Sequence, residues 1–110
     1  MLDETLSKIE DRLKQTSAIE SARREELLQL LEDLKEEIAD LAHSDPDHAQ
    51  SIASFADVST HEATRGEPQP VLLQHAVGGL SSSVLGFEQA HPKLTEIVNR
   101  LAISLSNMGV

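Results

Sequence analysis

The chain has 110 residues and no cysteine, and its 9 Lys and Arg against 19 Asp and Glu give a formal charge of −10. This length predicts one domain with a modest core, and the lack of cysteine excludes a disulfide scaffold, a thiolate metal site and a cysteine nucleophile. Phosphate contacts need clustered Lys and Arg, so the acidic balance predicts no nucleic-acid partner.

The amino terminus carries no sign of a secretory signal. Residues 1–4 read Met-Leu-Asp-Glu, which is acidic where a signal peptide is basic, and no apolar run follows. The most apolar stretch, 71–87, contains Gln74, His75 and three consecutive serines. It is only about as long as the shortest membrane-spanning helix of ~17 residues, and we interpret it as a buried helix. We therefore expect a cytoplasmic protein with no membrane partner.

Two runs of apolar residues step by three and four positions, at Leu2, Leu6, Ile9 and Leu13 and then at Leu27, Leu31, Leu34, Ile38 and Leu41. This spacing places each run along one face of an α-helix. Residues 16–18 break the pattern, and Ser17 followed by Glu20 has the form of a capping box that opens the second helix. The sequence predicts an acidic helical hairpin here.

A short third helix is predicted from Pro46 to Ala56. Asp45 suits an N-cap and Pro46 the first helical position, and Ile52 and Phe55 would be its buried residues. These elements complete an amino-terminal unit over 1–56. From 57 to 70 the apolar period disappears and two prolines and a glycine occur, which is typical of a loop or tether.

A carboxy-terminal helix pair is predicted over 71–110 within the same single domain. Apolar residues from Leu73 to Met108 step by four and three throughout, a period typical of bundles and coiled coils. Pro92 would cost ~3 kcal/mol inside a helix, so it either kinks one helix or separates two, at about 71–90 and 92–108. Gly109 and Val110 fit a Schellman motif that closes the last helix.

A row of small residues runs one position before this apolar seam. The small-residue row consists of Ala76, Gly79, Ser83, Gly86 and Ala90. We interpret it as a place where another helix approaches closely, either within the chain or between subunits.

No arrangement of catalytic or ligand-binding groups stands out. His43, Asp45, Asp47 and His48 are metal-ligand types, but their spacing matches no zinc or calcium motif, and capping explains the two aspartates. Ser81–Ser83 lack the glycine frame of a nucleophile elbow. We expect no catalytic residue, no cofactor and no metal, and therefore no enzyme.

The second predicted helix carries a dense run of carboxylates near its end. This acidic stretch consists of Glu32, Asp33, Glu36, Glu37 and Asp40. Like charges four residues apart destabilise a helix mildly, and acids near its carboxy terminus oppose its dipole. The stretch is either a docking face for a basic protein surface or a solvated face that keeps the protein soluble.

The carboxy-terminal third resembles a known family. Phe87-Glu88-x-x-His91-Pro92-x-Leu94, followed by Asn99 and a terminal Met-Gly-Val, is similar to the domain of unknown function 4404. The resemblance is specific over 87–110 and compositional over 1–45. It implies a small, helical, cytoplasmic bacterial protein and brings no activity; Phe87, His91, Pro92, Asn99 and Gly109 carry its motif.

Together these patterns predict an all-α fold, in which a helical hairpin and a Pro-broken carboxy-terminal helix form a bundle or a coiled-coil-like assembly. The leading hypothesis is a non-enzymatic interaction protein, an adaptor or regulator that self-associates. One alternative is a small ligand- or metal-binding accessory subunit of an enzyme, using His75, His91 and nearby carboxylates. Another is an acidic decoy whose acidic stretch occupies the basic groove of a larger protein.

Overall fold

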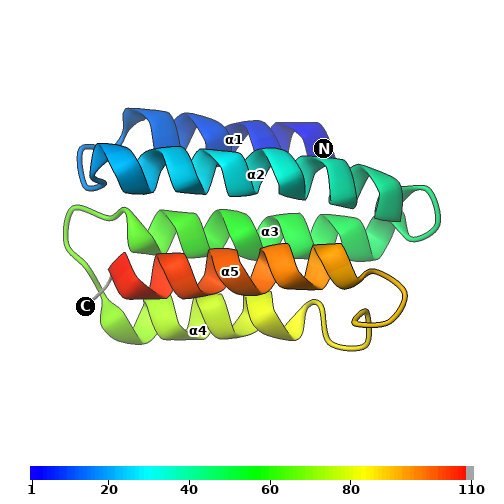
Figure 1. Cartoon of the computed structure of the whole chain (residues 1–110). Coiled ribbons are helices and arrows are strands. Elements are labelled where there is room, and N and C mark those ends of the chain that lie inside the picture. Colours follow the sequence, from blue (N-terminus) through cyan, green and yellow to red (C-terminus); the bar gives the residue numbers. More distant parts are fainter. Residues whose placement is uncertain (109–110) are drawn as a thin grey trace.

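The computed structural model describes residues 1–108, and these form five α-helices without a strand. The helices are α1 (Leu2–Gln15), α2 (Ser21–Ala42), α3 (Pro46–Ala63), α4 (Pro70–Ser82) and α5 (Pro92–Met108). They lie alongside one another in an elongated bundle measuring 38 × 24 × 23 Å (Figure 1). The predicted all-α bundle is confirmed.

Helix α3 is the centre of the bundle. It packs against each of the other four helices, whereas α1 contacts only α2 and α3. The side chains that α3 buries are mostly small: Ala49, Ile52, Ala53, Ala56, Ser59 and Thr60. Because the distance between two helix axes depends on the side chains at the contact, small residues on several sides let four helices gather around α3.

The predicted loop over 57–70 is wrong in its first half, because α3 continues to Ala63. Ser59 and Thr60 are fully buried, so this part of the core face is polar in composition. The Thr60 hydroxyl donates a hydrogen bond to the Ala56 carbonyl at 2.9 Å, which satisfies it inside the bundle. Phe55, in contrast, was predicted to be buried and is 42% exposed.

The start of α3 follows the prediction. Asp45 is its N-cap and accepts a hydrogen bond from the His48 backbone N–H at 3.1 Å, and Pro46 occupies the first turn. The carboxylate and the proline thus remove two of the unpaired N–H groups of the helix start.

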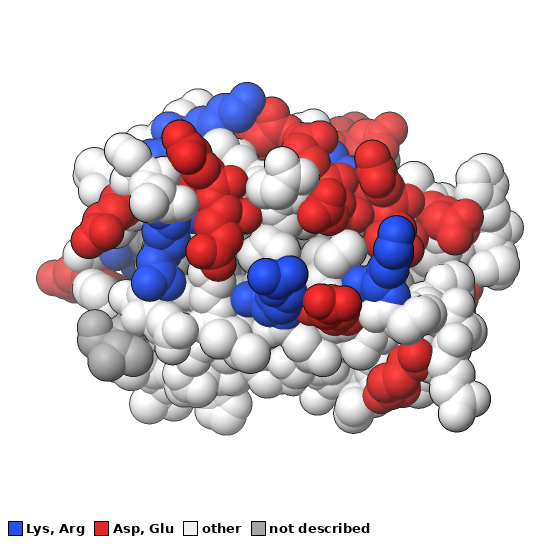
Figure 2. Space-filling model, in the orientation of Figure 1, with Lys and Arg blue, Asp and Glu red and all other residues white. Residues whose placement is uncertain are grey.

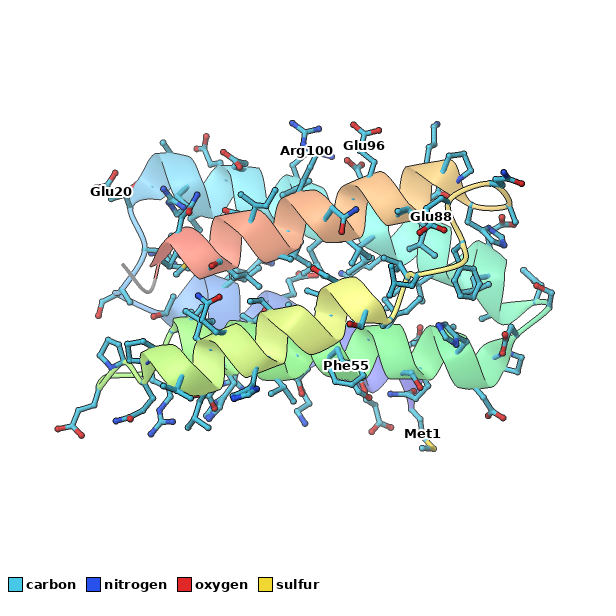
Figure 3. All side chains as sticks on the ribbon, turned by 90° about the horizontal axis from the view of Figure 1, so that it is seen from below. Met1, Glu20, Phe55, Glu88, Glu96 and Arg100 are labelled. Atoms are coloured by element: carbon cyan, nitrogen blue, oxygen red, sulfur yellow. The ribbon has the colours of Figure 1, made fainter. Side chains whose placement is uncertain are left out.

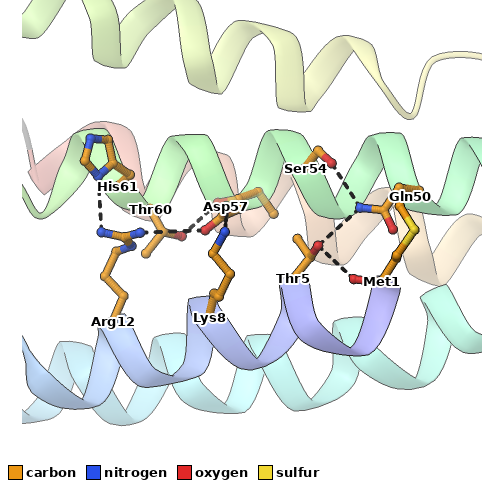
Figure 4. Close-up of polar contacts among 10 residues, drawn as sticks. Met1, Thr5, Lys8, Arg12, Gln50, Ser54, Asp57, Thr60 and His61 are labelled. Carbon is orange, nitrogen blue, oxygen red and sulfur yellow. Dashed lines mark hydrogen bonds and ion pairs between the residues drawn. The ribbon is translucent and has the colours of Figure 1, made fainter.

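A polar cluster fastens α1 to α3 (Figure 4). Lys8 Nζ lies 3.7 Å from Asp57 Oδ2, and Arg12 Nη2 lies 3.9 Å from Asp57 Oδ1. The Arg12 guanidinium also lies 3.1 Å from His61 Nδ1. Because Arg12 can only donate, His61 accepts on Nδ1 in this arrangement. These contacts use the turn of α3 that the sequence pattern assigned to a loop.

The turn between α1 and α2 is not closed by the predicted capping box. Helix α2 begins at Ser21, and its N-cap, Glu20, makes no side-chain cap hydrogen bond. Instead, the Arg24 guanidinium donates to four backbone carbonyls at 2.6–3.1 Å, those of Leu13, Lys14, Thr16 and Ile19. One positive side chain therefore satisfies the carboxy-terminal end of α1 and the turn that follows it.

Pro92 separates two helices rather than kinking one. Helix α4 ends at Ser82, eight residues earlier than expected, and turns over 83–91 lead to Pro92 at the start of α5. Gly86 lies in these turns with a φ of 92°, a backbone angle that glycine tolerates. The predicted Schellman motif at Gly109 and Val110 lies outside the described residues.

Candidate interaction surface

The acidic stretch of α2 lies beside basic residues of the same chain. Asp33, Glu36 and Glu37 line a hollow of about 250 Å³ with Lys93 and Arg100 of α5. Elsewhere in the stretch, Glu32 Oε1 lies 3.4 Å from Lys35 Nζ. Part of the negative charge therefore faces positive charge within the molecule, which reduces the field offered to an outside partner.

The small-residue row is a packing surface only along α4. Ala76 is buried, and Gly79 lies against the ring of Phe55, so that a methyl group at position 79 would sit 2.5 Å from Phe55 Cε1. At Gly79, the predicted close approach of another helix therefore occurs within the chain, between α3 and α4. Gly86 and Ala90 are exposed and lie beyond the end of α4. The row does not continue as a helical surface, because α4 ends at Ser82.

The opposite side of α4 is exposed, and we call it the α4 face. It consists of Val71, Leu72, His75, Gly78 and Ser82. Val71 is 69% exposed and Leu72 is 48% exposed. Helix α4 contains no Asp, Glu, Lys or Arg. In the space-filling view, the charged side chains gather over the upper part of the molecule, and its lower edge, where α4 runs, is largely free of them (Figure 2).

Helix α3 extends the α4 face. Phe55 and Val58 are 42% and 48% exposed, and with Gln50, Ser51 and Ser54 they line a shallow hollow of about 230 Å³. Figure 3 looks at the molecule from below and shows Phe55 beside α4. Two neighbouring helices thus each expose apolar side chains.

The histidines are mostly engaged in local contacts. The rings of His48 and Phe87 lie 4.6 Å apart, and those of Phe87 and His91 lie 5.8 Å apart. His48 Nε2 also contacts the Ser83 carbonyl. Phe87 is thus held between two imidazoles, and this row fixes the turns over 83–91 against the first turn of α3.

The motif residues around Pro92 build the start of α5. The His91 carbonyl accepts from the Thr95 backbone N–H at 3.1 Å and from its hydroxyl at 3.2 Å. Glu88 Oε2 accepts from the Gly86 N–H at 2.8 Å, within the turn that precedes the helix. In this arrangement the Phe-Glu-x-x-His-Pro-x-Leu motif acts as a turn and helix cap, with Leu94 buried behind it.

The model of a family described as Domain of unknown function (DUF4404) matches residues 29–110. The chain belongs to this family. The DUF4404 match begins within α2, covers α3, α4 and α5, and includes both the motif and the α4 face. No curated protein and no solved structure matches the chain.

Residues 1–108 contain neither a metal-binding cluster nor a membrane-spanning helix. In this part of the chain, no three His, Asp or Glu side chains are grouped so that they could hold a metal ion. Nor does any described helix combine the length and apolar character needed to cross a bilayer. His75 and His91, the candidates for a ligand-binding subunit, lie apart in the fold, on the α4 face and at the start of α5.

Proposed function

We propose that this DUF4404 protein is a non-enzymatic interaction protein of the bacterial cytoplasm, an adaptor or regulator that self-associates through the α4 face. The observation that carries the proposal is the group of exposed apolar side chains on a helix without charge, in a chain whose net charge is −10.

The charge distribution supports contact at this face. Two copies that meet through their acidic surfaces repel each other, and they must also strip water from carboxylates. Contact through Val71, Leu72, Phe55 and Val58 removes apolar surface from water without that cost. Burying apolar surface contributes about 25 cal/mol per Å², and this contribution opposes the loss of translational and rotational freedom that association costs.

The histidine contacts favour a role without chemistry. His48 and His91 lie against Phe87 rather than against a carboxylate that could orient either ring as a base. The acidic stretch is a weaker candidate surface than the α4 face, because Lys93 and Arg100 line the same hollow as its carboxylates.

The test places charge on the α4 face. The double variant Val71→Asp/Leu72→Asp adds two carboxylates to a contact that excludes water, so it should be monomeric where the natural chain is oligomeric. The matched control is Ile103→Asp, because Ile103 is 63% exposed but lies on α5. Light scattering over a hundredfold range of concentration measures the association state.

The expected result is that the natural chain and Ile103→Asp gain mass with concentration and that the double variant does not. A chain that stays monomeric at every concentration contradicts the self-association. Equal association of all three proteins contradicts the placement at the α4 face.

A further inference from the structure

We propose that the partner of the α4 face is a second copy of the chain, packed antiparallel so that the two α4 helices cross at Gly78. This inference rests on the proposed function and specifies its geometry. It predicts which residues of the two copies meet.

The exposed residues on one side of α4 form a single row. Val71, His75, Gly78 and Ser82 step by four, three and four, which places them on one side of the helix. Leu85 follows three residues later and is 69% exposed. The Leu85 N–H bonds the Ser82 carbonyl at 3.1 Å, in the turn that follows α4, and a turn of this kind places residues i and i+3 on the same side.

This row has an apolar residue at each end and a glycine in the middle. Val71 and Leu85 each lie seven residues from Gly78. In a two-fold contact the same patch is used by both copies, so a residue that meets a partner residue is met by it in return. An antiparallel crossing at Gly78 therefore pairs Val71 of each copy with Leu85 of the other, and it sets His75 opposite Ser81 and Ser82 opposite Gln74.

No contact among residues 1–108 accounts for Gly78. It lies inside α4, where glycine costs ~1 kcal/mol relative to alanine, and apart from its chain neighbours and the adjacent backbone of α4 no atom lies within 4 Å of the position that its Cβ would occupy. Its neighbour Gly79 differs, because it packs against Phe55. A glycine open to solvent in a helix is explained if another backbone approaches it from outside.

The charge of the chain disfavours contact between two copies anywhere but at an uncharged surface. The net charge of −10 makes the remaining surface repel a second copy, whereas α4 carries no charged side chain. When the second copy lies antiparallel to the first, the apolar ends of the two rows meet and a small residue lies at the crossing. A second copy can therefore pack on the α4 face without burying a charged side chain of α4.

Disulfide cross-linking tests the pairing, because the chain has no natural cysteine. The full chain is made with one cysteine, as V71C, L85C or I103C. Each variant is oxidised alone, and V71C is also oxidised together with L85C, in each case at the concentration where the natural chain is dimeric. The expected result is rapid cross-linking in the V71C and L85C mixture, at least tenfold faster than in V71C or L85C alone or in I103C.

Two outcomes overturn the inference. In a parallel dimer, V71C cross-links with itself faster than it does with L85C; the proposed function then stands, and only the pairing is wrong. If the natural chain is monomeric at every concentration, both the inference and the proposed self-association fail. This second result is also the one expected if a different protein covers the α4 face.

Substitution of the glycine gives an independent readout. Gly78→Ala should raise the thermal midpoint of the dilute monomer, because alanine favours helix and the site is open. The same variant should dimerise at least tenfold more weakly, because a methyl group holds the helices apart. Unchanged dimerisation with a raised midpoint places the crossing elsewhere and overturns the inference.

Discussion

The α1–α2 pair and the α3–α4 pair are two different solutions to helix packing in one small bundle. Residues 1–45 hold 6 basic and 13 acidic groups, and residues 46–110 hold 3 and 6. The first pair buries leucine seams, closes its turn with Arg24 and exposes charge. The second pair meets through small residues, with Gly79 against Phe55, and exposes apolar side chains. The difference teaches that the first pair faces solvent with charged side chains, whereas the second pair, in which α4 carries no charged residue, faces solvent partly with apolar ones.

The largest expected effect tests how tightly α3 is surrounded. Ala53 is fully buried on the central helix, so Ala53→Leu forces extra volume between helices that small residues hold close together. We expect a loss of unfolding free energy of about 1–3 kcal/mol. Urea unfolding measures this loss. Ala39→Leu on the exposed side of α2 is the control and should stay within about 0.5 kcal/mol of the natural chain.

If Ala53→Leu and Ala39→Leu are equally stable, the centre of the bundle has free space. The α3–α4 pair would then not be packed more closely than the α1–α2 pair.

The second prediction concerns the turn of the charged pair. Arg24→Met keeps much of the side-chain length but removes the donors to four carbonyls. We expect a loss of about 1–3 kcal/mol, because partly buried carbonyls lose a charged donor. Arg23→Met is the matched control, since Arg23 donates to one carbonyl, that of Ser104. Chemical unfolding that ranks the control as the less stable variant would contradict the role given to Arg24.

The smallest effect is expected from the ion pairs of Glu10, one with Lys14 within α1 and one with Lys35 of α2. Hydrogen bonds from Lys14 and Lys35 lower the pKa of Glu10 to about 2, from its ordinary value of 4.5. A lowered carboxyl pKa stabilises the fold above pH 4.5, and this contribution is lost as the pH falls toward 2. Glu10 is near the surface, so screening by solvent and salt keeps the contribution small.

Thermal midpoints of the natural chain and Glu10→Gln, measured from pH 7 to pH 2, test this assignment. The natural chain should have the higher midpoint at pH 7, and the two midpoints should converge on acidification. A difference that grows as the pH falls has the opposite sign and would show that Glu10 is not held as a carboxylate by its lysines.

Strong periodic and capping signals predicted much of the fold. The leucine seams placed α1 and α2, and Asp45 with Pro46 placed the start of α3. The rest of α3 was missed because Ser59 and Thr60 are polar by type yet fully buried, and the Thr60 hydroxyl is satisfied by the Ala56 carbonyl of its own helix. The spacing of apolar residues in a sequence does not reveal a polar side chain that is buried and hydrogen-bonded within its own helix.

The candidate site was harder to predict than the fold. Helix α4 is apolar on most sides, so its sequence reads as a buried helix, and only the assembled bundle shows that Val71 and Leu72 are left outside. The regular seam also continued through 83–91, where the chain turns instead. The spacing of apolar residues alone cannot distinguish a helix from turns that bury Val84 and part of Phe87.

The central claim is that the α4 face, and not the acidic stretch, is the contact surface. The most direct measurement is an amide NMR spectrum of the natural chain followed through dilution. We predict concentration-dependent shifts over 71–85 and at Phe55 and Val58, with residues 32–40 unchanged. Shifts confined to residues 32–40, or none at any concentration, would contradict this account.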